Sequence, residues 1–172
     1  VRSICARTPP CQPEYIGFTP WGLLAMQPAD IFVADSVAAV EALRPIWANL
    51  PVRDIDADID YFLTVVATHP RVRAPHVIHI RAADHDMIVV ARIEEQSQPF
   101  KLGYSTLFHV PQRALVLSFD GILGARGRTD EERAILALRA ALNRGEADRL
   151  ILPNLDIGGQ RFGAALSSTN WF

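Results

Sequence analysis

In the stretch FDGILGARGRTDEERAIL, three glycines recur at intervals of three between an apolar run and a charged amphipathic one. A glycine-containing loop that leads from a strand into a helix can offer backbone N–H groups and the positive end of the helix dipole to a phosphate. Gly124 and Gly127 would supply such a loop, and Arg126 and Arg128 could contact the same anion. The stretch is therefore either a phosphate-binding loop or a tight structural connection.

The residues that follow favour the structural interpretation. Thr129 and Glu132 have the spacing of a capping box, in which the two side chains satisfy the free amides at the start of a helix. Asp130, Glu131 and Glu132 place three carboxylates in the first turn, where each stabilises the helix by about 0.3–1 kcal/mol and repels a pyrophosphate. We predict a structural loop, with an anion site built on the two arginines as the alternative.

The other reactive side chains do not converge. His76 and His79 are three apart on a predicted strand and face opposite sides, so they cannot bind one metal ion together. His85 lies in the acidic turn ADHD, where we expect a solvated imidazole. His69 and His109 lie near predicted element ends. Because a catalytic zinc ion needs three converging ligands, we expect no metal site.

Acidic and sulfur-containing residues also have plain interpretations. The run DIDADID, residues 54–60, lacks the glycine and the terminal glutamate of a calcium-binding loop and is expected to be a solvated loop that caps the following helix. A disulfide between Cys5 and Cys11 is one option, but two cysteines make no framework, and we interpret both as incidental. With no secretory signal pattern, the sequence predicts a cytoplasmic protein.

Composition narrows the functional classes. The chain has 172 residues, of which 49% are hydrophobic and 21% charged, as is typical of one soluble globular domain. A net charge of −2 gives no basic field for nucleic acid. No apolar run approaches the roughly 20 residues of a membrane span. Sixteen of the 17 basic residues are arginine, a bias that we attribute to codon composition.

Periodicity predicts the elements that would position these residues. Residues 1–30 contain five prolines and are expected to form an irregular arm before a domain at 31–172. Helices are expected near 35–50, 59–69 and 130–144, with a kink at Leu43–Arg44 caused by Pro45. Residues 75–95 are predicted to form an antiparallel hairpin. Further strands are expected at 101–110, 113–123 and 148–155, and a weak helix at 158–168.

This order predicts an α/β fold with a mixed, partly antiparallel sheet and packed helices. A helix that connects the last two strands makes them parallel. The segments RAPHVIHI, MIVVARIE, KLGYSTL, LSFDGILG and LRAALNRGEADRLILPNL together resemble the N-terminal half of bacterial GNAT-superfamily proteins of the cellulose-biosynthesis CelD-like kind. The resemblance covers about residues 35–168 and implies a GNAT-like domain truncated at its C-terminus.

The resemblance implies an N-acyltransferase that moves an acyl group from acyl-coenzyme A to an amine or hydroxyl. The main catalytic half would be a C-terminal GNAT-like half, which would also be the partner of this domain. Acetyl-coenzyme A or another acyl-coenzyme A would be a co-substrate, and no resident cofactor is required. The alternative is a degenerate GNAT-like interaction module without catalysis.

The resemblance also points to individual residues. The family's loop resembles Arg/Gln-x-x-Gly-x-Gly/Ala, and the step from Gly124 to Gly127 departs from it, which places coenzyme A binding by Gly124, Arg126, Gly127 and Arg128 in question. A GNAT general base often comes from the part of the sheet that contains Glu94, although a solvent-facing strand end is the plainer interpretation. Tyr104 could transfer a proton, although packing within its strand is the default for an aromatic residue.

Overall fold

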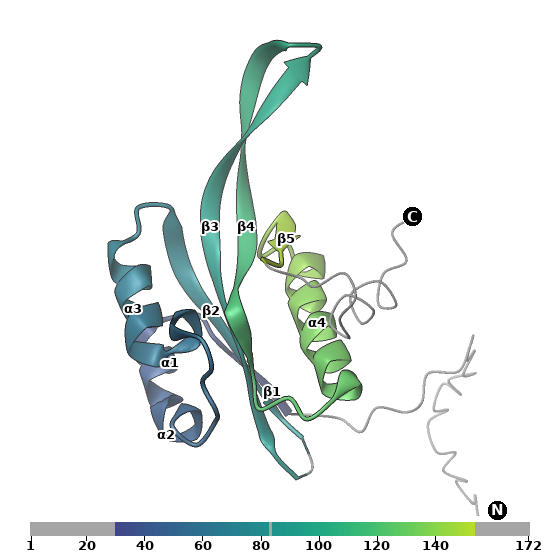
Figure 1. Cartoon of the computed structure of the whole chain (residues 1–172). Coiled ribbons are helices and arrows are strands. Elements are labelled where there is room, and N and C mark those ends of the chain that lie inside the picture. Colours follow the sequence, from purple (N-terminus) through teal and green to yellow (C-terminus); the bar gives the residue numbers. More distant parts are fainter. Residues whose placement is uncertain (1–29, 83, 154–172) are drawn as a thin grey trace, which may run out of the picture.

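The computed structural model describes residues 30–82 and 84–153, which form a five-stranded sheet with helices on both faces (Figure 1). The strands are β1 (Asp30–Ala34), β2 (Val72–Arg81), β3 (Asp86–Leu102), β4 (Ser105–Leu123) and β5 (Arg149–Ile151). The helices are α1 (Val37–Ala42), α2 (Arg44–Trp47), the short 3₁₀ helix η1 (Ile55–Ala57), α3 (Ile59–Thr68) and α4 (Arg128–Asn143). The predictions for the N-terminal arm, both cysteines and the helix at 158–168 lie outside the described residues.

The sheet has the strand order β1-β2-β3-β4-β5. Neighbours from β1 to β4 are antiparallel, and β4 pairs with β5 in parallel. The crossover helix α4 connects these last two strands, as predicted. The α/β class and the mixed, partly antiparallel sheet are therefore confirmed.

Capping side chains and a proline determine where the N-terminal helices begin and end. The Ser36 side chain caps α1 by accepting from the Ala39 N–H, and the helix breaks at Leu43 because Pro45 lies in the first turn of α2. The carboxylates of Asp54 and Asp58 cap η1 and α3 in the same way. The predicted kink and the capping role of the DIDADID run are confirmed. The run is not the solvated loop that the sequence predicts, because it contains η1 and because Ala57 and Ile59 are buried in an apolar cluster.

The strand prediction needs two corrections. Residues 101–110 and 113–123 are not separate strands, because β4 runs unbroken from Ser105 to Leu123 and the chain reverses at Gly103–Tyr104. Pro111 lies inside β4, where its missing N–H is tolerated because β5 pairs with β4 only from Ala114 onward. The second correction is β1, a strand that the sequence patterns do not predict. It pairs with β2 along its full length.

A bulge interrupts the pairing of β3 and β4. Val89 pairs with Ile122 and Ala91 with Leu117, so residues 118–121 face a single residue of β3. A Cβ at Gly121 would lie 2.8 Å from two backbone oxygens, which explains the glycine as a close-packing residue. The bulge bends β4 just before the loop that leads into α4.

Two apolar clusters flank the sheet. One lies between the sheet and α4 and includes Ile78, Leu115 and Leu138. The other lies beneath α1, α2 and α3 and includes Trp47 and Phe62. In Figure 1 these helices and α4 cover opposite faces of the sheet.

His76 makes stability depend on pH. Its side chain is 2% exposed, and burial lowers its pKa although the Glu146 carboxylate 3.6 Å away opposes the shift. Because the folded pKa lies below the unfolded value of about 6.5, the unfolded chain takes up the proton first as the pH falls. The stabilising contribution of neutral His76 is present above about pH 6.5 and is lost below it.

We expect the urea midpoint of the wild-type chain to fall more steeply than that of His76→Gln between about pH 7.5 and pH 5.5. The matched control is His109→Gln, which removes an exposed imidazole that belongs to neither apolar cluster. Parallel curves for the wild-type chain and His76→Gln would mean that burial of this imidazole does not influence acid stability.

Candidate functional site

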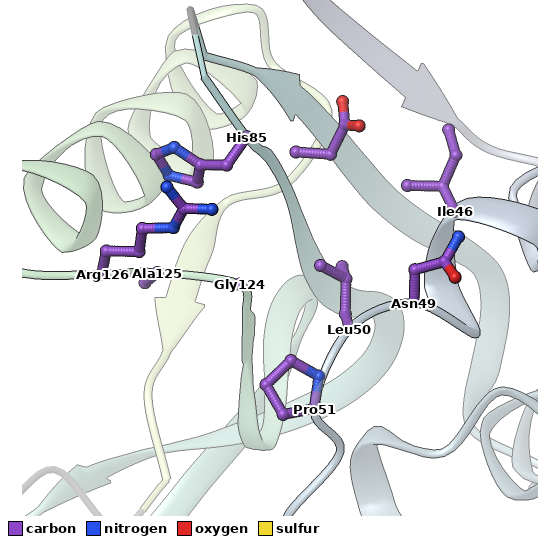
Figure 2. Close-up of a pocket in the computed structure, with 9 residues that line it drawn as sticks. Ile46, Asn49, Leu50, Pro51, His85, Gly124, Ala125 and Arg126 are labelled. Carbon is purple, nitrogen blue, oxygen red and sulfur yellow. The ribbon is translucent and has the colours of Figure 1, made fainter.

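A cavity of about 400 Å³ lies where the loop between β4 and α4 meets the β2–β3 turn and the end of α2 (Figure 2). Gly124, Ala125 and Arg126 line it from the loop, and His85 and Asp86 line it from the turn. The α2 side contributes Ile46, Asn49, Leu50 and Pro51. The cavity therefore joins the glycine loop to a histidine and a carboxylate from another part of the chain.

The loop glycines have different reasons to be glycine. Gly124 has a positive φ of 79°, and a Cβ there would lie 2.5 Å from the carbonyl oxygen of Asp86. It is thus needed both for left-handed geometry and for close approach to the β2–β3 turn. Gly127 has an extended φ of 174° with open space around it, and it is the N-cap of α4. Of the two glycines predicted to bind coenzyme A, only Gly124 lines the cavity.

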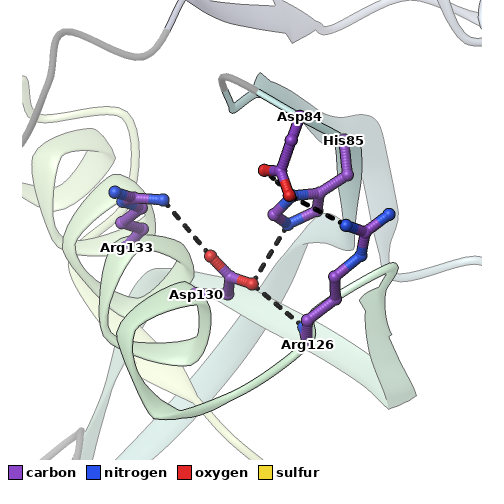
Figure 3. Close-up of polar contacts among 5 residues, drawn as sticks. All are labelled: Asp84, His85, Arg126, Asp130 and Arg133. Atoms are coloured by element: carbon purple, nitrogen blue, oxygen red, sulfur yellow. Dashed lines mark hydrogen bonds and ion pairs between the residues drawn. The ribbon is translucent and has the colours of Figure 1, made fainter.

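The predicted capping box does not form. Thr129 lies inside α4 instead of capping it, and Gly127 offers no side chain to the free amides. The carboxylate of Asp130 replaces the box, because its Oδ2 accepts from the backbone N–H of Arg126 at 2.9 Å (Figure 3). The Asp130 carboxylate therefore occupies a backbone N–H group that would otherwise be able to donate to a bound anion.

His85 is not the solvated imidazole that the sequence predicts. Its side chain is only 10% exposed and lies between two carboxylates. Nδ1 is 2.8 Å from Oδ1 of Asp84, and Nε2 is 3.0 Å from Oδ2 of Asp130 (Figure 3). Each ring nitrogen of His85 therefore has a carboxylate oxygen as its partner. The bond from His85 is the main reason that the pKa of Asp84 is lowered.

Both loop arginines are engaged by acidic side chains. Nη1 of Arg126 lies 2.9 Å from Oδ2 of Asp84, and Nε of Arg128 lies 2.8 Å from Oε1 of Glu132. All four side chains are at least one-third exposed. Exposed pairs of this kind contribute between about 0 and 1 kcal/mol, so a stronger anion could displace either carboxylate. Arg126 lines the cavity, whereas Arg128 is not among its lining residues.

Glu94 and Tyr104 lie away from this cavity. Glu94 is not at a solvent-facing strand end, since it is 7% exposed in the middle of β3 and accepts from Nε of Arg92 at 2.7 Å. It lies six residues along β3 from Ile88, the partner of Leu123, which corresponds to about 20 Å of strand. Tyr104 is fully exposed at the tip of the β3–β4 hairpin instead of packing in a strand. The structure does not bring either residue to the glycine loop.

The two strand histidines face opposite layers, as predicted. His79 Nε2 lies 2.8 Å from Oδ1 of Asp86, on the side of α1–α3, while His76 approaches Glu146 on the side of α4. Within residues 30–82 and 84–153, no three His, Cys, Asp or Glu side chains are arranged to hold a metal ion. No helix in this part of the chain has the length and apolar character to cross a bilayer.

Sequence reasoning missed the contact between His85 and Asp130, which are 45 residues apart. The signal in the sequence is weak. A carboxylate at the third position of a helix that lacks a capping side chain can turn back to the preceding amides, but nothing local indicates that a turn histidine reaches it. Comparison with known proteins finds no match among protein-family models, curated proteins or solved structures.

Proposed function

We propose that this chain is the N-terminal portion of a GNAT-like N-acyltransferase whose main catalytic half belongs to a further C-terminal domain. The observation that carries the proposal is the unit β4–loop–α4–β5, in which a crossover helix joins two parallel strands and begins at a glycine loop that lines a cavity. In GNAT-like proteins such a helix start holds the pyrophosphate of acyl-coenzyme A, whereas in this chain the Asp130 carboxylate occupies the corresponding amide. Because acyl-coenzyme A would be the co-substrate, the proposal includes a cytoplasmic location.

In the proposed reaction, a base removes a proton from an amine or hydroxyl acceptor. The acceptor then attacks the thioester carbonyl, the bond to sulfur breaks, and coenzyme A leaves as the thiolate, which takes up a proton. Backbone donors would stabilise the oxygen on which charge develops. The contribution of this chain would be to shape the acceptor side and complete the sheet, since Glu94 and Tyr104 lie far from the cavity.

A second candidate, a non-catalytic GNAT-like interaction module, is favoured by the state of the loop itself. Asp130 accepts from the Arg126 amide, and Asp84 pairs with the Arg126 side chain. The groups that would bind a pyrophosphate are thus already engaged by carboxylates. A domain that had lost coenzyme A binding would have this arrangement.

Titration calorimetry with acetyl-coenzyme A is the first test. For the chain alone, we expect no binding tighter than about millimolar, because the buried Asp130 carboxylate already occupies the Arg126 amide at the start of α4. For a longer chain that continues the reading frame past Phe172, we expect binding and release of free thiol when an amine acceptor is added.

Other outcomes of the calorimetry would indicate a coenzyme A site in this domain itself or a non-catalytic interaction module. Binding by the chain alone near about 1 µM, lost in Arg126→Ala/Arg128→Ala, would make this domain itself the coenzyme A site and contradict the proposed division of labour. Arg81→Ala/Arg113→Ala is the matched control, because it removes two exposed arginines that do not line the cavity. If the longer chain neither binds nor releases thiol, the interaction module is the correct function.

A further inference from the structure

The outer part of the β3–β4 hairpin, residues 96–112, projects beyond the rest of the sheet (Figure 1). We call this segment the arm. Strand β2 pairs with β3 only up to Glu94, and β5 pairs with β4 only from Ala114. Every residue of the arm is exposed or half-buried. Arg149 of β5 bonds to Gln96 and Gln98 at the base of the arm. Among residues 30–82 and 84–153, the strands of the arm pair only with each other, and no residue of the arm belongs to either apolar cluster.

The arm is nevertheless rich in apolar side chains. Six of the twelve large exposed hydrophobic residues in the described part of the chain lie on it. They are Phe100, Leu102, Tyr104, Leu107, Phe108 and Val110. The rings of Phe100 and Phe108 stack with their centroids 4.8 Å apart, and Val110 follows Phe108 on the same face of its strand. Contiguous apolar surface of this kind on a soluble domain marks an interaction site.

Charge is almost absent from the arm. Lys101 is the only Lys, Arg, Asp or Glu between residues 96 and 112, in a chain that is 21% charged. A two-fold contact between identical surfaces places like residues near one another, so a charged surface would repel its own copy. A neutral, aromatic surface has no such penalty. It also offers nothing to attract a strongly charged partner.

The edges of the arm are less suited to pairing than its face. Pro99 lies in β3 and Pro111 in β4, and each lacks the backbone N–H that an added strand would need. Proline on an edge strand is a common device against edge-to-edge pairing. Contact through the side chains of the stacked phenylalanines is therefore favoured over extension of the sheet.

We propose that the arm is a self-association surface, through which two copies of this chain pack together by the face that carries Phe100, Phe108 and Val110, with Tyr104 at the tip. Covering a fully exposed aromatic side chain buries about 150–250 Å², so Tyr104 and the two half-exposed phenylalanines together bury about 300–500 Å² per copy, the size of a weak, reversible interface. The inference is independent of acyl transfer, because the arm does not line the cavity.

Sedimentation equilibrium of the 172-residue chain between about 1 and 100 µM tests the proposal. We expect a dimer with twice the 19.0 kDa mass of the chain. The variant Phe100→Ser/Phe108→Ser should be monomeric over the same range, with at least a tenfold weaker association. The matched control is Ile55→Ser, which removes a 67% exposed apolar side chain from η1 and should leave the dimer intact.

Two further measurements keep the result specific to the arm. Replacing residues 97–111 by Asn-Gly closes a short hairpin on the pair Gln96–Gln112 and should also give a folded monomer, with circular dichroism as the folding check. Amide hydrogen exchange within residues 98–110 should slow as the concentration of the wild-type chain rises. A wild-type monomer at the highest concentration, or a dimer that survives both arm variants, would overturn the proposal. Monomeric chain that co-sediments with phosphatidylcholine vesicles through Tyr104 would instead assign the arm to a membrane surface.

Discussion

Asp130→Ala is expected to lower the free energy of unfolding by about 3–5 kcal/mol, the range for breaking a buried ion pair by removing one partner. The carboxylate is 7% exposed and serves three donors from different parts of the chain. They are the backbone N–H of Arg126 at 2.9 Å, Nε2 of His85 at 3.0 Å and Nη1 of Arg133 at 3.2 Å. Alanine leaves all three without this acceptor. Urea denaturation of both proteins measures the difference.

The neighbouring ion pair between Glu132 and Arg128 supplies the control for this substitution. Glu132→Ala removes an acidic side chain from the same helical turn, but its bond to Arg128 is exposed, so the cost should stay within about 1 kcal/mol. Equal losses for the two variants would mean that the burial of Asp130 is not what makes its contacts stabilising.

Asp130→Ala also tests whether a carboxylate blocks an anion site. Once Asp130 is replaced by alanine, the Arg126 amide and Nε2 of His85 are free to bind an anion at the start of α4, while Nδ1 of His85 keeps its bond to Asp84. Pyrophosphate should therefore raise the melting temperature of Asp130→Ala and leave that of the wild-type chain unchanged, because ligand binding to the folded state stabilises it. Stabilisation of the wild-type chain to the same extent would show that Asp130 does not exclude the anion.

The sequence is most informative where a signal is local. Pro45 forces a break in its helix whatever surrounds it, and Asp58 caps α3 through amides two and three residues away. The crossover of α4 between parallel strands follows from element order alone. Each of these features depends on chain geometry within a few residues or on a general rule of connection.

Features that depend on distant partners are not predicted. The segment DIFVA becomes β1 because Ile31 pairs with Ile80 from a remote part of the chain, and its own composition, preceded by prolines, does not indicate that neighbour. Pro111 has the local pattern of a break between strands, although it is tolerated where β4 has no partner on one side. Both features depend on which part of a strand lies at the edge of the sheet, and a local sequence pattern does not indicate where that edge is.

The candidate site is predicted in part for the same reason. Gly124 and Arg126 do line a cavity, but His85 and Asp86 reach it from the β2–β3 turn. The loop approaches this turn closely, since a Cβ at Gly124 would lie 2.5 Å from the carbonyl oxygen of Asp86. Position 124 is therefore a point where the sheet, the turn and the start of α4 are in close contact.

Gly124→Ala is expected to destabilise the fold by about 2–5 kcal/mol through two separable effects. The positive φ of 79° costs an L-residue about 1–2 kcal/mol. The new Cβ would also lie 2.5 Å from the Asp86 carbonyl oxygen and 3.0 Å from Cδ2 of Leu50. Because the first of these is backbone, the loop or the β2–β3 turn has to move. Urea denaturation measures the total cost, and the same shift should distort the cavity.

Gly103→Ala separates strain from steric overlap. Gly103 has a φ of 61°, close to that of Gly124, but an alanine Cβ at this position would have no atom within 4 Å beyond its chain neighbours. Alanine there should cost only the conformational term of about 1–2 kcal/mol. Alanine at Gly127, where φ is extended and the surroundings are open, should cost no more than about 1 kcal/mol. A loss at Gly124 no larger than that at Gly103 would mean that the loop can move away from the turn without penalty. The cavity would then not be held in shape by this contact.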